Sequence, residues 1–220
     1  MILRSRQWWM GLGVGAVTWL TLWIIIFIAQ LGGAHPHNQW IVESYAKKMA
    51  RAKAIKGPKI VVVGGSAALF GIDSGKLEEA FNRPAVNLAV SAGIGPHAIA
   101  AYADNVIGRG DLVFMPLEYA LLTWGGLPNH VMIDYALEYP KHLSAWPFGT
   151  LLDALWQVSL LRLVEGFKGL PEGFAVVGLY GPHNTDVRGD QTGNDLASRA
   201  DYMIAAVRDA EAGRYGRDYN

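Results

Sequence analysis

The chain has 220 residues with 19 basic and 19 acidic side chains, so its formal net charge at neutral pH is zero. A neutral chain gives no support for general binding to nucleic acid, which needs an excess of positive charge. The absence of cysteine excludes disulfides, thiolate metal sites and cysteine nucleophiles. The length is enough for one domain with its own core, with or without a membrane anchor.

The N-terminal part has the pattern of a membrane-spanning helix. Residues 8–31 carry no charge, and about 20 apolar residues suffice for a helix to cross the hydrocarbon core. The apolar core of a signal peptide is shorter, at about 7–15 residues. We therefore expect residues 1–34 to be a retained transmembrane anchor, with the lipid bilayer as a partner. Arg4 and Arg6 precede the span and no basic residue follows before Lys47, which predicts a cytoplasmic N-terminus.

The next segment, residues 35–57, has the pattern of a basic amphipathic helix. Ile41, Tyr45, Met49 and Ala52 fall on one stripe at helical spacing. Such a helix could lie on anionic lipid headgroups or stand as a solvated stalk between the anchor and a domain. We favour the stalk.

No cofactor or metal site is expected. His35 and His37 are close enough in sequence to suggest a metal pair, but no Asp, Glu or Cys flanks them at ligand spacing. Polarity of an interfacial loop is the favoured interpretation of these two histidines. The glycine-rich stretch 64–71 lacks both the G-x-G-x-x-G pattern and the lysine of a P-loop, so nucleotide binding has little support.

Residues 58–220 are expected to form one α/β domain. The β-branched run at 59–63 is typical of a strand buried on both faces of a parallel sheet. Two further strands are predicted at 85–90 and 112–119, and helical patterns separate all three. Connections too long for hairpins predict parallel strands with right-handed crossovers and helices on both faces, which is a three-layer α/β/α arrangement.

The regular alternation ends after the third strand. Residues 150–167 are strongly apolar at helical spacing and predict one helix, which either packs in the core or docks on a protein of the cell envelope or on the membrane. Residues 173–177 could form one more short strand. A last helix is predicted over 196–213.

Polar or flexible residues follow each of the three predicted strands. Ser66 comes directly after the first strand, Gly93 follows the second and Glu118 ends the third. Because a parallel sheet binds its ligands beyond the carboxyl ends of its strands, we expect these residues to meet in one crevice. The alternative for Ser66 is a hydroxyl that caps the helix after it.

The blocks "GGSAALFG" and "VNLAVSAG" resemble those of the SGNH, or GDSL-like, hydrolase superfamily. The resemblance covers about residues 58–120 and implies a flavodoxin-like α/β/α fold, with Ser66 as nucleophile and the backbone N–H of Gly93 in the oxyanion hole. With a membrane span ahead of it, the chain is similar to anchored SGNH-like proteins of bacterial envelope polysaccharide systems. That similarity implies a single-pass inner-membrane protein with a periplasmic domain, acting on acetyl esters of a glycan.

The sequence departs from the superfamily pattern in two ways. Glu118 stands where the superfamily has an asparagine in the oxyanion hole, so we expect it at the edge of the site. None of the six histidines has an Asp three residues before it, so the late Asp-x-x-His block is absent. The domain is thus expected to be truncated or degenerate relative to the superfamily. His97 and His183 are the remaining candidates for the base that a serine nucleophile needs.

Two functions therefore follow from the sequence. The first is a membrane-anchored esterase or O-acyltransferase that uses Ser66. The alternative is a non-catalytic, membrane-tethered scaffold of an envelope polysaccharide assembly, since a fold does not imply its usual chemistry.

Overall fold

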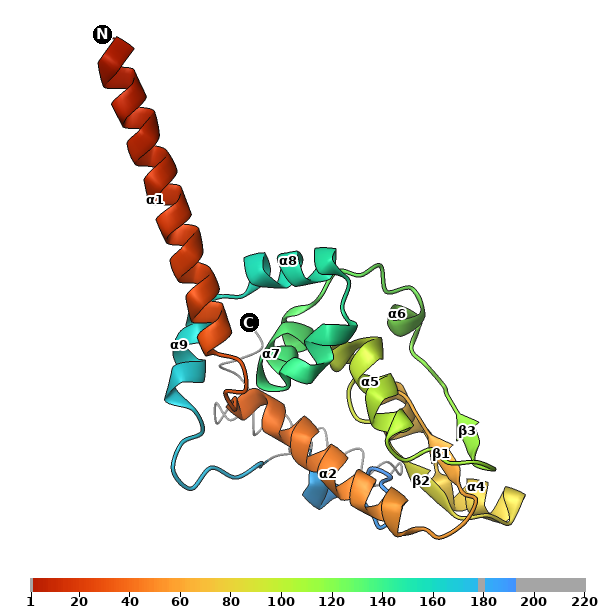
Figure 1. The fold of residues 1–220 in the computed structure, drawn as a ribbon. Coiled ribbons are helices and arrows are strands. Elements are labelled where there is room, and N and C mark those ends of the chain that lie inside the picture. Colours follow the sequence, from red (N-terminus) through yellow and green to blue (C-terminus); the bar gives the residue numbers. More distant parts are fainter. Residues whose placement is uncertain (1, 178–180, 193–220) are drawn as a thin grey trace.

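A computed structural model describes residues 2–177 and 181–192. The long elements and strands, in chain order, are α1 (Ile2–Ala29), α2 (Gln39–Ala54), β1 (Ile60–Val62), α3 (Ser66–Gly71), α4 (Ser74–Phe81), β2 (Ala85–Asn87), α5 (Gly95–Asp104), β3 (Leu112–Phe114), α6 (Tyr119–Leu122), α7 (His130–Glu138), α8 (Phe148–Gln157) and α9 (Leu160–Lys168) (Figure 1). Short 3₁₀ segments are η1 (Pro36–Asn38), η2 (Ala92–Ile94), η3 (Pro140–Ala145) and η4 (Pro182–Asn184).

The described strands form one parallel three-stranded sheet in the order β2-β1-β3. Val61 in the central strand lies opposite Val86 on one side and Val113 on the other. The expected order of strands and helices is confirmed, and so is an α/β fold with parallel strands. Helices connect the strands because parallel neighbours need a crossover longer than a hairpin.

Side chains of β1 and of Val63 after it alternate between the two faces of the sheet, because successive residues of a strand point to opposite faces. Val61 and Val63 pack with the cluster that α2 and α5 contribute to. Val62 packs on the other face with Ala68 and Leu69 of α3. All residues of β1 are buried, which explains why the segment reads as a continuous apolar run.

Helix α2 lies against the sheet instead of standing clear of it. Ile41, Tyr45 and Ala52 of the expected stripe are each 1% exposed and belong to the same cluster as Val61 and Val86. The segment expected as a solvated stalk is therefore a layer of the globular body. The sequence predicted the apolar stripe, but it did not predict that the stripe packs on the sheet.

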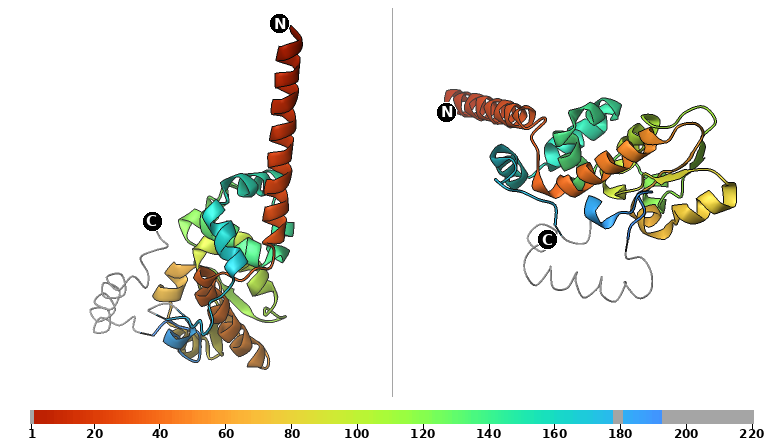
Figure 2. Two further views of the ribbon diagram at one scale, coloured as in Figure 1. Left: turned by 90° about the vertical axis from the view of Figure 1, so that its left-hand side faces the viewer. Right: turned by 90° about the horizontal axis from the view of Figure 1, so that it is seen from below.

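Helix α1 projects from one end of this body (Figures 1 and 2). Within it, Gln7–Ala29 has a mean hydropathy of 2.2 and is long and apolar enough to cross a membrane. The sequence expectation of one N-terminal span is supported to that extent.

A second apolar cluster joins α7, α8, α9 and the end of α1. Its buried members include Leu137 of α7 and Leu163 of α9, and Trp23 and Phe27 of α1 pack against it. The single helix expected over 150–167 is two helices. Val158 is the C-cap of α8, and Ser159 caps α9, where its hydroxyl oxygen accepts a hydrogen bond from the backbone N–H of Arg162.

The C-terminal expectations are tested only in part. Residues 173–177 form no strand, so the short strand expected there is not found. The helix expected over 196–213 lies outside the described residues.

We expect Leu137→Ala to lower the free energy of unfolding by about 2–5 kcal/mol, because it empties a fully buried position in the second cluster. Leu122→Ala is the matched control: Leu122 is exposed on α6, and the change should stay within about 0.5 kcal/mol. Thermal unfolding in detergent, followed by circular dichroism, measures both. Equal effects would show that the second cluster is not tightly packed.

Candidate functional site

The turn after β1 places Ser66 on the surface at the carboxyl end of the sheet. Gly64 and Gly65 are buried, whereas Ser66 is exposed as the first residue of α3. A Cβ on Gly65 would lie 2.5 Å from the backbone nitrogen of Ala92, which is closer than real contacts allow. The turn after β1 and the turn after β2 therefore touch, as expected, and a glycine is required where they do.

Glu118 binds the first turn of α3. Its carboxylate accepts a hydrogen bond from the backbone N–H of Gly65 at 3.1 Å and another from that of Ala67 at 2.8 Å. These N–H groups are among those that a helix start leaves without a backbone partner. Gly65 is the N-cap and no side chain of its own caps α3, so the carboxylate from the third strand end satisfies this turn. Ser66 does not act as the cap.

The expected oxyanion donor, the backbone N–H of Gly93, already has a partner in this structure. The N–H of Gly93, in η2, donates to the hydroxyl oxygen of Ser91 at 3.1 Å. The donors at Gly65 and Ala67 face a carboxylate, whose negative charge would repel a developing oxyanion. The turns that carry Ser66, Gly93 and Glu118 do meet at the strand ends. The N–H of Gly93 and the carboxylate of Glu118 are bonded to other residues of these turns and are not arranged around an open oxyanion position.

The two candidate bases make other contacts. The ring of His97, in the first turn of α5, stands edge-on to Trp124 with centroids 5.2 Å apart. His183 lies in η4, a segment that Lys47 of α2 holds through hydrogen bonds to the carbonyls of Pro182 and Thr185. Among the described residues, no hydrogen bond joins the Ser66 hydroxyl to a histidine.

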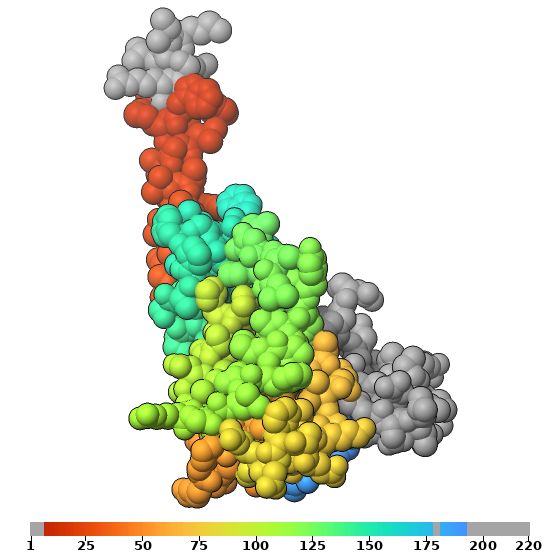
Figure 3. Space-filling model, turned by 90° about the vertical axis from the view of Figure 1, so that its right-hand side faces the viewer, coloured from red at the N-terminus to blue at the C-terminus, as the bar shows by residue number. Residues whose placement is uncertain are grey.

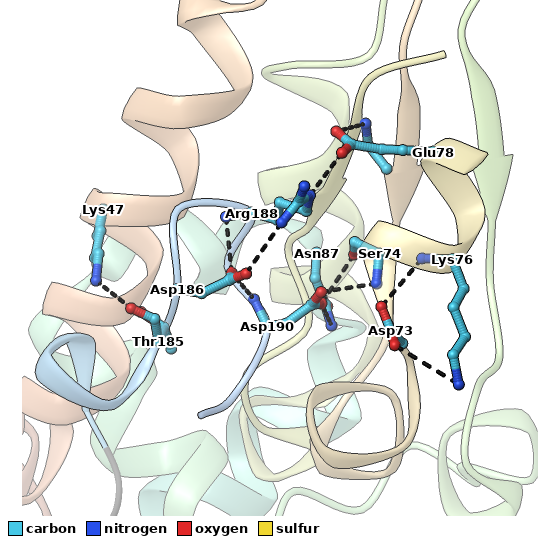
Figure 4. Close-up of polar contacts among 11 residues, drawn as sticks. Lys47, Asp73, Ser74, Lys76, Glu78, Asn87, Thr185, Asp186, Arg188 and Asp190 are labelled. Atoms are coloured by element: carbon cyan, nitrogen blue, oxygen red, sulfur yellow. Dashed lines mark hydrogen bonds and ion pairs between the residues drawn. The ribbon is translucent and has the colours of Figure 1, made fainter. Parts of the chain in front are cut away.

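A polar network that the sequence did not reveal lies beside β2 (Figure 4). Asp190 accepts hydrogen bonds from the backbone N–H and the hydroxyl of Ser74, at 2.7 and 2.8 Å, and from the side-chain amide of Asn87 at 3.0 Å. Arg188 donates to Glu78 of α4 at 2.6 Å. Its carbonyl also accepts from the N–H of Asn87, so this loop covers the free edge of β2. The network fastens residues 185–191 to the body.

Lys48 of α2 is buried next to this network, with 1% exposure. Its ammonium group donates to the carbonyl of Ala89 at 2.5 Å. Burial lowers the pKa of Lys48 to about 7, although Asp190 and Asp186 act in the opposite direction. The burial of Lys48 could not be predicted from the sequence, because a lysine exposed to solvent can occupy the same position in a helical pattern.

Buried polar contacts join the segment after α1 to α7. The carboxylate of Glu138 accepts from the side-chain amides of Asn38 at 3.0 Å and Gln39 at 2.7 Å, and from the N–H of His35 at 3.3 Å. Burial, followed by the charge of Arg162, lowers the pKa of His35 to about 4. His35 is therefore neutral at pH 7. The loop was expected to be polar because it lies at a solvated interface. Its polar groups instead form buried hydrogen bonds that fix it to α7.

A small pocket of about 130 Å³ lies beside this junction. It is lined by His37, Asn38, Trp40, Ile41, Ser91, His130, Val131 and Asp134. Within the residues that the structure describes, no group of three or more histidine or carboxylate side chains could hold a metal ion. Comparison of the chain with protein-family models, curated proteins and solved structures gave no match.

Gly65→Ala should destabilise the protein by about 1–3 kcal/mol, because the added methyl group would overlap the turn at Ala92 and the carboxylate of Glu118. Gly71→Ala, on the same helix, is the control, since a Cβ there meets nothing within 4 Å. Urea unfolding of both variants in detergent provides the comparison. A Gly65→Ala protein as stable as Gly71→Ala would contradict the close contact between the two turns.

The depressed pKa of Lys48 predicts a pH dependence of stability. Between about pH 7 and 9.5 the unfolded lysine, with a pKa near 10.4, holds more protons than the folded one. The free energy of unfolding should therefore rise with pH in this window, by up to about 1.4 kcal/mol per unit from this group. Lys48→Met should flatten the profile, whereas Lys53→Met, an exposed position on the same helix, should not. An unchanged slope in Lys48→Met would refute the assignment.

Proposed function

We propose that this chain is a membrane-tethered, SGNH-like module of a bacterial cell envelope, whose sheet serves as a scaffold in the described state. Tethering through α1, with the N-terminus in the cytoplasm and the body outside, is supported by the apolar span and by Arg4 and Arg6 ahead of it. The SGNH-like assignment rests on the motif residues after β1 and β2, together with the parallel order of the strands.

The observation that carries the scaffold proposal is the position of Glu118. Serine hydrolysis needs a base for the hydroxyl and preset donors for the oxyanion. The described residues offer Ser66 no histidine partner, and Glu118 fills the N–H groups of Gly65 and Ala67. These contacts favour a structural role for the turn, which joins three strand ends, over a catalytic role in acyl transfer.

Acyl-ester chemistry on an envelope glycan is the second candidate, favoured by the exposure of Ser66 at the carboxyl ends of the strands. In that reaction the Ser66 oxygen attacks the acyl carbonyl, its proton passes to a base, and the glycan alcohol leaves with a proton. Water or another glycan hydroxyl then takes the acyl group from the serine. His97 or His183 could supply the base only if it moved to Ser66.

Labelling of the detergent-purified protein with a fluorophosphonate separates the two functions. The scaffold proposal predicts no labelling of folded wild-type protein, because no base contacts the hydroxyl within the described residues. Labelling that is lost in Ser66→Ala and kept in Ser144→Ala, an exposed serine of η3, would overturn it in favour of acyl-ester chemistry.

Glu118→Gln adds a second test of the same turn. The amide keeps one acceptor oxygen but removes the negative charge, and the scaffold proposal predicts that this variant also stays unlabelled. Labelling of Glu118→Gln alone, with circular dichroism matching the wild type, would show that the carboxylate holds Ser66 inactive. That result would favour the second candidate.

A further inference from the structure

We propose that α8 and α9 lie in the outer interface of the bilayer that α1 crosses, with their exposed apolar side chains in the lipid. This inference rests on the proposed membrane tether and adds a second membrane contact to it. It assigns lipid, and not an envelope protein, as the occupant of the surface at residues 148–167.

Helices α8 and α9 present an apolar surface that nothing in the described structure covers. Its exposed apolar members are Phe148, Leu152 and Trp156 of α8 and Leu160, Leu161, Val164 and Phe167 of α9. The three on α8 are spaced by four residues and so share one face. Trp156 is 75% exposed. We call these seven residues the apolar surface.

The apolar surface is free of charge. All residues from 148 to 167 are described, and every exposed one among them is uncharged. Two charged side chains of α9 turn towards the body, where Arg162 pairs with Asp134 at 3.0 Å and Glu165 contacts His35 at 3.3 Å. The third, Lys168, is exposed at the last residue of α9, beyond the apolar surface. Such a division is typical of a helix that lies in a membrane interface with its apolar side in lipid.

Contacts with α1 set the depth of α8 in the bilayer. The indole N–H of Trp23 donates to the carbonyl of Leu155 at 2.8 Å. Trp23 precedes Ala29, the end of the span, by six residues, which is about 9 Å along a helix axis. An interfacial helix buries its apolar face by about 5–10 Å. A span that ends at Ala29 therefore brings α8 to interfacial depth without any movement of the body.

Aromatic contacts hold α8 against the span. Trp156 of α8 stands edge-on to Trp19 of α1, with ring centroids 6.5 Å apart, and Trp19 stacks on Trp23. Trp19 precedes Ala29 by ten residues, about 15 Å along a helix axis, so the Trp156 side chain would reach into the hydrocarbon of the bilayer that α1 crosses. Figures 1 and 2 show α8 at the end of the body from which α1 leaves, and Figure 3 shows its atoms beside α1 on the molecular surface.

The position of the apolar surface favours lipid over a soluble protein partner. Any partner seated on Trp156 would lie next to Trp19, a residue inside the apolar span. A water-soluble protein could reach that depth only by displacing lipid from α1. Burial of seven large apolar side chains in lipid is favourable without a partner, at roughly 25 cal/mol per Å² of apolar surface removed from water.

The test uses the absence of cysteine in the full chain. Single-cysteine variants Leu152→Cys and Leu160→Cys are labelled with a nitroxide and reconstituted in vesicles of phosphatidylethanolamine and phosphatidylglycerol. Collision rates with oxygen, which concentrates in lipid, and with a water-soluble nickel chelate report the surroundings of each label. Phe81→Cys is the aqueous control, because Phe81 is exposed on α4, away from α1 (Figure 1). Val14→Cys, exposed in the middle of α1, is the lipid control.

The proposal predicts an oxygen-to-nickel collision ratio severalfold higher at positions 152 and 160 than at Phe81→Cys, and close to that of Val14→Cys. Ratios like that of Phe81→Cys would overturn the interfacial contact and leave the tether intact. Shielding from both reagents would also overturn it, because a protein surface would then cover the helices. A water-like ratio at Val14→Cys would refute the tether, and the interfacial contact with it.

Discussion

The hydrogen bonds from Gly65 and Ala67 to Glu118 link the ends of β1 and β3 and thereby define the surface on which any activity of this fold would depend. They also hold the first turn of α3 in place, and so the exposed position of Ser66. The third connection is steric: Gly65 contacts Ala92 so closely that no other residue fits. Three strand ends are thus joined by one carboxylate and one glycine. The same carboxylate puts a negative charge beside Ser66, where it would repel a developing oxyanion, and this feature of the turn is the basis of the scaffold proposal.

The sequence predicted the parts of the fold that depend on local patterns. The buried run at β1, the two later strands and the apolar stripe of α2 were all visible, because periodicity records which side of an element is buried. It does not record what covers that side, so α2 was expected as a stalk although it lies on the sheet. The division between α8 and α9 depends on Ser159, a cap that resembles any surface serine within an apolar segment.

The site was predictable to the same limited degree. Ser66, Gly93 and Glu118 follow strand ends, and parallel topology alone brings such residues together. Their hydrogen bonds could not be foreseen, because they depend on backbone geometry within each turn. The network around Asp190 was missed since Asp190 and Ser74 are 116 residues apart in the chain, and the sequence contains no signal for a contact over that separation.

The buried junction at Glu138 has a consequence for the space that Ser66 can reach. Asn38 and Gln39 are hydrogen-bonded to Glu138 within ten residues of the end of α1. The segment between the span and the body is therefore held in place and is not a flexible linker. Ser91, which follows β2, shares a pocket with His37 of this junction, so the carboxyl ends of the strands lie on the membrane side. A body fixed to the span in this way cannot move far from it. With α1 in a bilayer, as proposed, Ser66 would stay near the membrane surface and would meet molecules made, carried or anchored there.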